Sequence, residues 1–331
     1  MSISGCAEPM NFLAYLFAVL KCVIYGSTIF FTTKLTQSVD VMDILALRFL
    51  LSFVVMWILK TTRLVKINVG VKDFFGKSER APFFKNLFFA ALFEPVLYML
   101  FETFGVSMTT NVTAAVIVSL SPISSCIIEE VFLKERSTLL QKIFLGCGMF
   151  GVIYIAVNTN TSDGKNSLAG IILLVCSVLS GSLFAAFSRK SSPHFSSMEI
   201  TYFSCMLGAV IFNAVNVVRH LIAGNILNYF DPYFNVDNII GFLFLGVLST
   251  IVATGMNNFA LSRIQVSTMA AFGGVSTIVT IVIGIVFGNE SLELYHFIGL
   301  PFILVRMIGV SAISIGKSRR ASKSAETTEA K

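Results

Sequence analysis

The sequence predicts an all-α integral membrane protein with ten transmembrane helices, arranged as two inverted five-helix repeats. Three observations support this prediction. The chain is 55% hydrophobic and only 13% charged, whereas soluble globular domains carry about 25% charged residues. Ten apolar runs have roughly the 20-residue length that a membrane-spanning helix needs. A shift of 155 residues superimposes glycine and charged positions of the first half on those of the second.

The ten runs are apolar on all sides and lack the two-residue alternation of a membrane β-barrel. Short connections at 105–111, 132–139 and 260–267 indicate helical hairpins. The expected spans are 11–32, 42–59, 84–105, 111–132, 139–157, 168–188, 197–217, 238–260, 267–288 and 294–316.

The basic residues are distributed unevenly between the two sides of the expected membrane. Of the 24 Lys and Arg residues, only Lys34, Lys165 and Arg219 fall in connections opposite the N-terminal side. Lys and Arg accumulate in cytoplasmic loops, so we expect both termini in the cytoplasm and the chain in the plasma membrane. The net charge of +6 is then a topology signal, and the expected surroundings are a lipid bilayer and no nucleic acid.

The cysteines and histidines do not suggest a metal or catalytic centre. The six cysteines have no CxxC spacing, and the three histidines lie in separate connections or helix ends. Neither an HExxH motif nor a Walker motif occurs. We therefore expect no catalytic residue, no metal and no cofactor. An intramembrane enzyme, a receptor and a channel stay as weaker alternatives to a transporter.

The 155-residue shift pairs Glu135 with Glu290 and Gly26 with Gly181. Because the period holds five spans, an odd number, the second copy must enter the membrane upside down. Inverted repeats recur in secondary transporters, with the substrate site near the midplane between the halves. The expected units are residues 1–160 and 161–316, followed by a disordered cytoplasmic tail at 317–331. Glu135 and Glu290 each precede a span and are expected to fix a helical hairpin.

Five short stretches resemble the EamA-type transporters of the drug/metabolite transporter superfamily. They are YGSTIFFTTK (Tyr25–Lys34), LRFLLS (Leu47–Ser52), SLSPISS (Ser119–Ser125), FLKERS (132–137) and FGNES (287–291). The resemblance implies a ten-helix carrier of small organic solutes, often an exporter of amino acids or related metabolites. It also implies structural roles for Arg48 and Pro122. Tyr25 departs from the Trp common in the family, and Thr277 replaces the proline of the second copy.

Five charged residues are expected deep inside the spans, where a charge costs about 2.5–3.5 kcal/mol on insertion scales. They are Lys21, Arg48, Glu94, Glu102 and Arg306. The 155-residue shift copies none of them, and charges unique to one half are the better candidates for facing a solute. The residues expected to bind substrate are Lys21, Tyr25, Glu94, Tyr98 and Asn257. Arg306 is expected to serve helix packing or a homodimer contact, with substrate contact as the alternative.

Glu94, Tyr98 and Glu102 are spaced to share one helix face, and Pro95 is expected to interrupt that helix beside Glu94. We expect a Lys21–Glu94 pair at the midplane. Two interpretations are open: a pair that a zwitterionic solute separates, and a static pair that closes the bundle. Glu94 or Glu102 is also a candidate proton carrier.

Other polar residues are expected to have structural roles. Glu129 and Glu130 are interpreted as a solvated charge cluster at the cytoplasmic end of span 111–132. Asn213 and Asn216 are expected to join helices or to contact substrate. The predicted function is a secondary transporter, an exporter or exchanger of a small polar or zwitterionic metabolite such as an amino acid, working by alternating access. A facilitative metabolite permease is the alternative.

Overall fold

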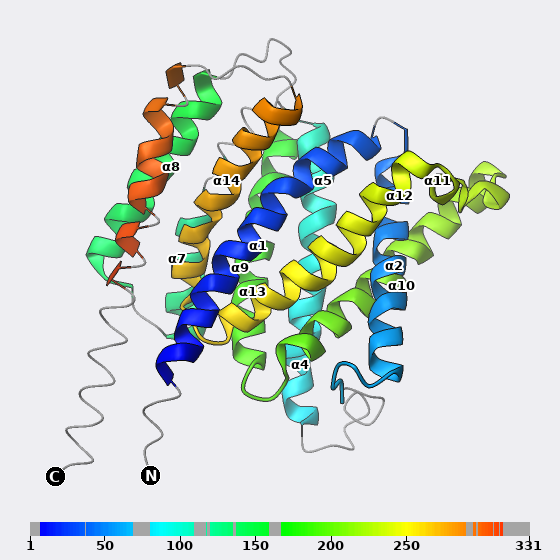
Figure 1. Ribbon diagram of the computed structural model, residues 1–331, viewed down its shortest axis with the longest axis horizontal. Helices are drawn as coiled ribbons and strands as arrows, with labels where there is room; N and C mark the ends of the chain where they lie inside the picture. Colours follow the sequence, from blue (N-terminus) through cyan, green and yellow to red (C-terminus); the bar gives the residue numbers. More distant parts are fainter. Residues whose placement is uncertain are drawn as a thin grey trace.

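The computed structural model describes residues 7–36, 38–68, 80–108, 117, 120–134, 137–158, 167–288, 294–295, 297–306, 308–310 and 312–313. Within these ranges every regular element is a helix and no β-strand forms. The long helices run side by side and obliquely between an upper and a lower end of the molecule (Figure 1). The all-α prediction is therefore confirmed for the described part of the chain.

In the first half the helices are α1 (Ala7–Thr36), α2 (Val41–Thr61), α4 (Ala81–Ala91), η2 (Leu92–Leu97), α5 (Tyr98–Ser107), α7 (Ser121–Ile128), η3 (Glu129–Leu133) and α8 (Leu139–Asn158). In the second half they are α9 (Leu168–Ser191), α10 (Ser197–Ala223), η4 (Ile226–Asn228), α11 (Asp231–Phe234), α12 (Val236–Leu243), η5 (Phe244–Ala253), α13 (Thr254–Leu261) and α14 (Val266–Gly288). A last helical segment covers Phe297–Val310.

Six described helices are long and apolar enough to cross a membrane. They cover Phe12–Thr36, Val41–Thr61, Ala81–Gly105, Leu168–Ser191, Ser197–Ala223 and Asn238–Leu261. The other four expected spans correspond to α7 with η3, to α8, to α14 and to the segment Phe297–Val310. The structure thus has six candidate spans and several further apolar helices.

Two of the six spans contain wide, π-type turns. η2 interrupts the span 81–105, and Glu94 within it leaves the helical conformation with φ −140° and ψ 122°. Pro95 explains this break, because a proline disfavours helical geometry in the residue before it. The predicted interruption beside Glu94 is therefore confirmed. The second wide segment, η5, lies in the middle of the span 238–261.

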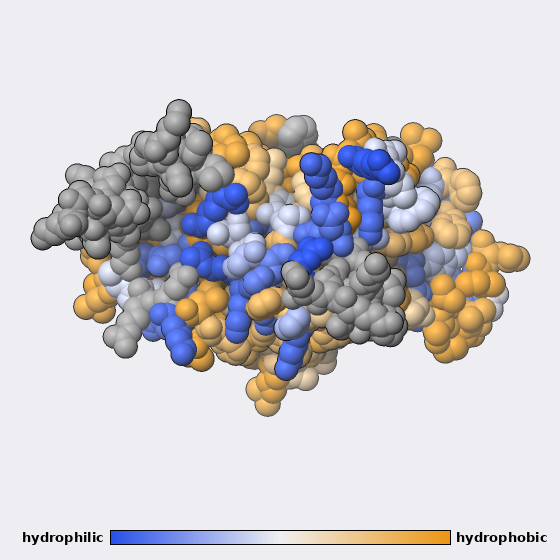
Figure 2. All heavy atoms as spheres, turned by 90° about the horizontal axis from the view of Figure 1, so that it is seen from below, coloured by the Kyte–Doolittle hydropathy of each residue, from blue (hydrophilic) through white to orange (hydrophobic). Residues whose placement is uncertain are grey.

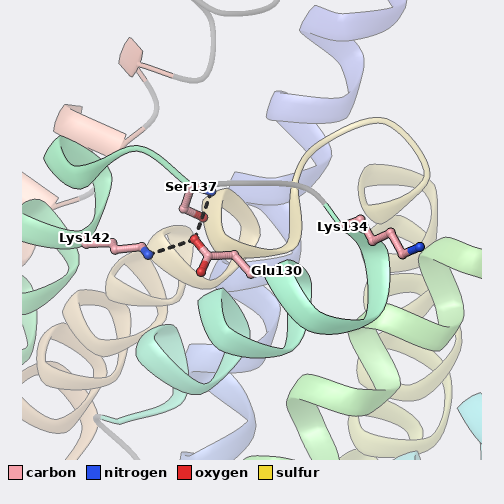
Figure 3. Close-up of a pocket in the computed structure, with 4 residues that line it drawn as sticks. All are labelled: Glu130, Lys134, Ser137 and Lys142. Carbon is pink, nitrogen blue, oxygen red and sulfur yellow. Dashed lines mark hydrogen bonds and ion pairs between the residues drawn. The ribbon is translucent and has the colours of Figure 1, made fainter.

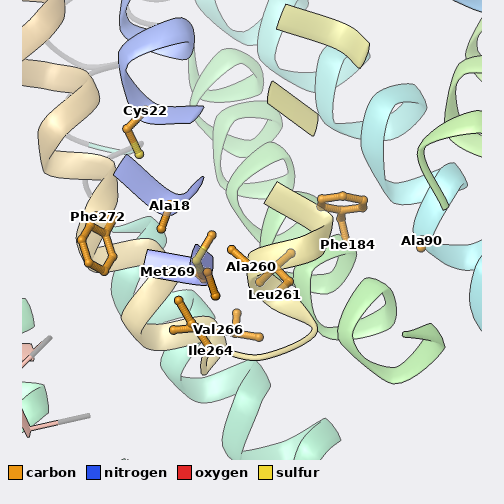
Figure 4. Close-up of a cluster of buried hydrophobic side chains, with 11 residues drawn as sticks. Ala18, Cys22, Ala90, Phe184, Ala260, Leu261, Ile264, Val266, Met269 and Phe272 are labelled. Carbon is orange, nitrogen blue, oxygen red and sulfur yellow. The ribbon is translucent and has the colours of Figure 1, made fainter. Parts of the chain in front are cut away.

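The helices pack so that the two halves of the chain interlock. α1 lies against α14 on one side and against η5 and α13 on another, while α2 lies along α10. A buried apolar cluster joins α1, α4, α9, α13 and α14 (Figure 4). Its members include Ala18, Cys22, Phe184, Leu261 and Met269.

The lower end of the molecule in Figure 1 carries the ends of α2 and α9 and the starts of α4 and α10. Seen from below, hydrophilic side chains gather in the middle of this face between apolar margins (Figure 2). Exposed basic residues of these elements and of the α13–α14 connection are Arg63, Lys66, Lys85, Lys190 and Arg263. Apolar flanks with a polar end face are the arrangement that a bilayer requires.

Candidate functional site

Three hydrogen-bonded pairs connect α1 with the antiparallel η5–α13 segment, and we call them the polar ladder. Lys21 Nζ donates to Asn257 Oδ1 over 2.9 Å. The hydroxyls of Tyr25 and Thr254 lie 3.1 Å apart. Thr28 Oγ1 donates to Ser249 Oγ over 3.3 Å. The α1 members are spaced i, i+4 and i+7, so one face of α1 presents all three.

The ladder places a cation deep in the bundle with a neutral partner. Lys21 is 9% exposed and Asn257 is 8% exposed. Among the described residues Lys21 forms no ion pair, so the expected direct Lys21–Glu94 pair is absent. The amide oxygen of Asn257 satisfies one of the three ammonium donors but carries no charge. Lys21 therefore keeps capacity for an anionic group.

Glu94 is the acidic counterpart of this site and stands at the helix break in η2. It is half-buried, and within the described residues it has no hydrogen bond and no ion pair. The charged groups whose fields act on it are Lys21, Glu102 and Arg48. The carboxylate and the ammonium therefore belong to one electrostatic environment without touching each other. Opposite charges that are not paired with each other can each pair with one charge of a zwitterionic ligand.

Tyr98 and Glu102 continue the same face of the interrupted helix. Tyr98 OH donates to Glu102 Oε1 over 2.8 Å. The Tyr98 ring lies against Gly181 on α9, where an added Cβ would come within 3.3 Å of Tyr98 Cδ2. The glycine that the repeat pairs with Gly26 therefore gives this tyrosine its place beside the second half.

Arg48 lies in α2 and is 9% exposed. Its Nε donates to Thr250 Oγ1 in η5 over 2.9 Å. One turn further, Ser52 Oγ donates to the Gly246 carbonyl over 2.7 Å. These bonds attach α2 to the wide segment η5, and they agree with the structural role that the resemblance implied for Arg48.

The interpretation of Glu129 as a solvated residue was wrong. Glu129 is 0% exposed, and its Oε1 accepts a hydrogen bond from the Val266 N–H over 2.8 Å. Val266 is the first residue of α14, so a carboxylate from η3 caps the N-terminus of a helix in the other half. Gln265, which precedes α14, is not a common N-cap residue. The absence of a local capping side chain was the sequence signal that a residue from elsewhere in the chain caps this helix.

Glu199 was also missed as a buried acid. It is 4% exposed and completes a capping box with Ser196 at the start of α10. Its Oε1 also accepts from Asn68 N over 2.9 Å and from Arg80 Nη1 over 3.2 Å. The Ser-x-x-Glu spacing predicts the capping box, but the contacts from the segment between α2 and α4 depend on the tertiary fold.

Glu130, in contrast, lies at a surface pocket of about 460 Å³ between η3 and α8 (Figure 3). Its Oε1 accepts from Lys142 Nζ over 2.8 Å and from Ser137 N over 3.2 Å. These bonds fix the hairpin in which Glu135 was expected to act. Glu135 and Glu290 themselves lie outside the described residues. Pro122 occupies the first turn of α7, where proline is well tolerated.

The other polar residues of the spans join helices. Asn216 Nδ2 donates to Asp43 Oδ1 over 2.8 Å, and Asn213 Nδ2 donates to the Ala46 carbonyl over 3.0 Å. Arg306 is 3% exposed within one chain, and its expected role in helix packing or a homodimer contact stays a prediction. The described residues include no group of three side chains able to hold a metal ion.

A family model matches this chain twice, over residues 12–157 and 168–312, and its description is the EamA-like transporter family. The chain belongs to the EamA-like transporter family. The two matches include every residue of the polar ladder and also Glu94, Tyr98 and Glu102. Membership makes the chain a multi-pass membrane transporter of the general kind that the five sequence stretches indicated.

Relatives of this transporter support the assignment along nearly the full length. The uncharacterized transporter YcxC of Bacillus subtilis (strain 168) is 34% identical over 307 residues, which are 93% of this chain and 95% of YcxC. The uncharacterized transporter YetK of the same organism is 22% identical over 298 residues, 88% of this chain and 84% of YetK. A protein of known crystal structure is 13% identical, with a TM-score of 0.70 covering 93% of this chain and 98% of that one. That last likeness shows the fold alone.

Proposed function

We propose that this EamA-like transporter is a secondary carrier for a small zwitterionic metabolite such as an amino acid. The observation that carries the proposal is the separated pair of charges in the bundle. Lys21 has only a neutral side-chain acceptor, and Glu94 has no partner among the described residues. An α-carboxylate would find the ammonium of Lys21, and an α-ammonium would find the carboxylate of Glu94. A buried charge requires such a reason, because desolvation is expensive.

The helix break beside Glu94 supports a solute-binding site next to Lys21 and Glu94. Transporter sites near the midplane are commonly built on discontinuous helices, whose exposed backbone groups face the ligand. Tyr25 has its ring centroid 5.7 Å from Lys21 Nζ, and Tyr98 follows Glu94 by four residues, so both tyrosines add hydroxyls near the charges. In our proposal Glu94 holds the solute ammonium, Lys21 holds its carboxylate, and Tyr25, Tyr98 and Asn257 orient it.

The proposal includes ten spans in two inverted five-helix units, with both termini in the cytoplasm. The wide turns support the repeat. Shifted by 155 residues, the limits of η2 become 247 and 252, which fall inside η5 (Phe244–Ala253). Interrupted helices in corresponding positions of the two halves are a recurring feature of inverted-repeat transporters.

The test is transport by the purified full chain in proteoliposomes. Vesicles are loaded with a radiolabelled panel of neutral, acidic and basic amino acids, and efflux is followed for the wild type, Lys21→Met and Glu94→Gln. The change Glu130→Gln, at a half-buried surface position, serves as the matched control. We expect saturable efflux of at least one solute by the wild type and the control, and a large loss in both site variants. Wild-type rates in both correctly folded site variants would overturn the proposal.

A pH gradient across the same vesicles separates exchange or proton coupling from a facilitative permease. Coupling through a carboxylate predicts that an imposed gradient drives accumulation in the wild type and fails to do so in Glu94→Gln or Glu102→Gln. A facilitative permease would equilibrate the solute regardless of the gradient.

A further inference from the structure

Arg306 in the last helical segment is a buried cation that the proposed solute site does not use. Its side chain is 3% exposed, and its Nε has no hydrogen-bond partner within the described part of the chain. No acidic side chain of the described ranges forms an ion pair with it. A guanidinium stays charged at all physiological pH values. An uncompensated charge in this position is strongly destabilising unless a counter-charge is supplied.

The surrounding helices are built to admit this side chain. A Cβ added to Gly148 on α8 would lie 2.2 Å from Arg306 Cδ, and one added to Gly274 on α14 would lie 2.9 Å from Arg306 Nη2. A larger residue at Gly148 would collide with the arginine stem, and one at Gly274 would crowd Ile303 and the guanidinium. Two helices thus form a slot for Arg306, with α8 beside its aliphatic stem and α14 beside one guanidinium nitrogen.

A second buried cation lies near the slot. Lys21 and Arg306 are both within electrostatic range of Cys22 on α1. Within the described residues neither has an acidic partner.

From this geometry we infer that Arg306 is the centre of a second site, which binds a small carboxylate anion. The planar guanidinium presents paired N–H donors that match the two oxygens of a carboxylate. The anion would supply the counter-charge that the described protein residues do not. The site is distinct from the proposed Lys21–Glu94 solute site, and the inference does not depend on transport of any solute.

The test is thermal unfolding of the purified full chain in detergent, with acetate and benzoate as the probes. Acetamide and benzamide are the neutral analogues, chloride holds the ionic strength constant, and inorganic phosphate is a separate arm. We expect the carboxylates to raise the Tm of the wild type and of the exposed control Arg63→Met, and the amides to leave it unchanged. The carboxylate shift should vanish in Arg306→Met and be reduced but present in Arg306→Lys.

A wild type that does not respond to carboxylates, or an Arg306→Met protein that keeps the full wild-type shift, would overturn the inference. A shift caused by phosphate alone would overturn the assignment to carboxylates. If Arg306→Met does not fold, equilibrium dialysis of radiolabelled benzoate against the wild type and Arg306→Lys decides, and equal affinity in the two overturns the inference. Because none of these readouts is transport, their failure would leave the Lys21–Glu94 proposal untouched.

Discussion

Lys21 on α1 donates a hydrogen bond over 2.9 Å to the side-chain oxygen of Asn257 on α13, so a cation of the first half is held by an amide of the second. If this ammonium binds the carboxylate of the solute, Lys21→Met should weaken solute affinity while leaving the fold intact. Hydrogen bonds to charged groups contribute about 1.5–3 kcal/mol, which is roughly a 10- to 150-fold loss of affinity. The measurement is solute concentration dependence of efflux. Asn257→Ala should have a smaller effect, because it leaves the charge in place.

Glu94 should select the charge of the solute. With Glu94→Gln the site loses its negative charge, so we expect transport of the zwitterion to fall and binding of a singly negative analogue, such as the N-acetylated solute, to improve relative to the wild type. Competition of the two compounds for efflux measures this preference. An unchanged ratio of the two affinities would show that Glu94 does not face the solute.

Glu129 should contribute considerably more to the free energy of unfolding than its neighbour Glu130. Glu129→Ala leaves the Val266 N–H without its carboxylate acceptor, and an unsatisfied buried donor costs about 1–3 kcal/mol. The matched change Glu130→Ala breaks a partly exposed surface pair with Lys142, and ion pairs at the surface contribute little. Thermal unfolding of the two variants in detergent should therefore show a clear loss for the first and a much smaller one for the second. Equal losses would contradict the cap.

Gly26 should tolerate no larger residue, whereas Gly146 should. A Cβ at Gly26 would lie 2.6 Å from the Ser276 carbonyl oxygen, and one at Gly146 would meet nothing within 4 Å. Overpacking of this kind costs roughly 1–3 kcal/mol, so Gly26→Ala should lower the Tm. Gly146→Ala should hold or raise it, because alanine is favoured over glycine in a helix by about 1 kcal/mol. A similar Tm in the two variants would argue against close contact of α1 and α14.

Acid should release the contact between Asp40 and Arg219. Partial burial raises the pKa of the Asp40 carboxyl, but hydrogen bonds from Arg219 and the Met42 N–H outweigh burial and lower that pKa overall. A lowered folded-state pKa gives stability that is present above the unfolded value, about 3.9, and lost as pH falls through the folded value. Asp40→Asn should therefore reduce unfolding stability slightly at pH 7 and have no effect near pH 2. A loss that persists at pH 2 would exclude this ion pair as its cause.

The helical fold was largely predictable because a helix that spans a bilayer needs about 20 mostly apolar residues, and such runs can be read from the sequence. Apolar length predicted the six candidate spans that the structure describes, and Pro95 predicted the break beside Glu94. The 155-residue shift pairs Glu135 with Glu290 but gives Lys21 and Glu94 no charged counterpart. This difference made Lys21 and Glu94 the predicted solute-binding charges. These three inferences use only local sequence or its periodicity, and none of them depends on knowing which helices are in contact.

Partners were less predictable than positions. Asn257 was expected near the solute, but its bond to Lys21 depends on the angle at which α13 meets α1. Glu129 stands beside Glu130 in sequence, yet one is buried under α14 and the other faces the surface pocket. Adjacent residues of a helix point about 100° apart, and only the tertiary arrangement decides which one meets protein.

The wide segment η5 determines which side chains can meet α1 at all. Ser249 and Thr254 are five residues apart, and in a regular helix of 3.6 residues per turn they would point about 140° away from each other. Here Thr254 Oγ1 reaches the carbonyl of Ser249 itself, and both residues bond to α1. The wider turn thus brings Ser249 and Thr254 to the same face of the helix, the face that contacts α1. Deleting one residue from 244–253 would restore a regular phase, and the two ends of the ladder would then face different neighbours.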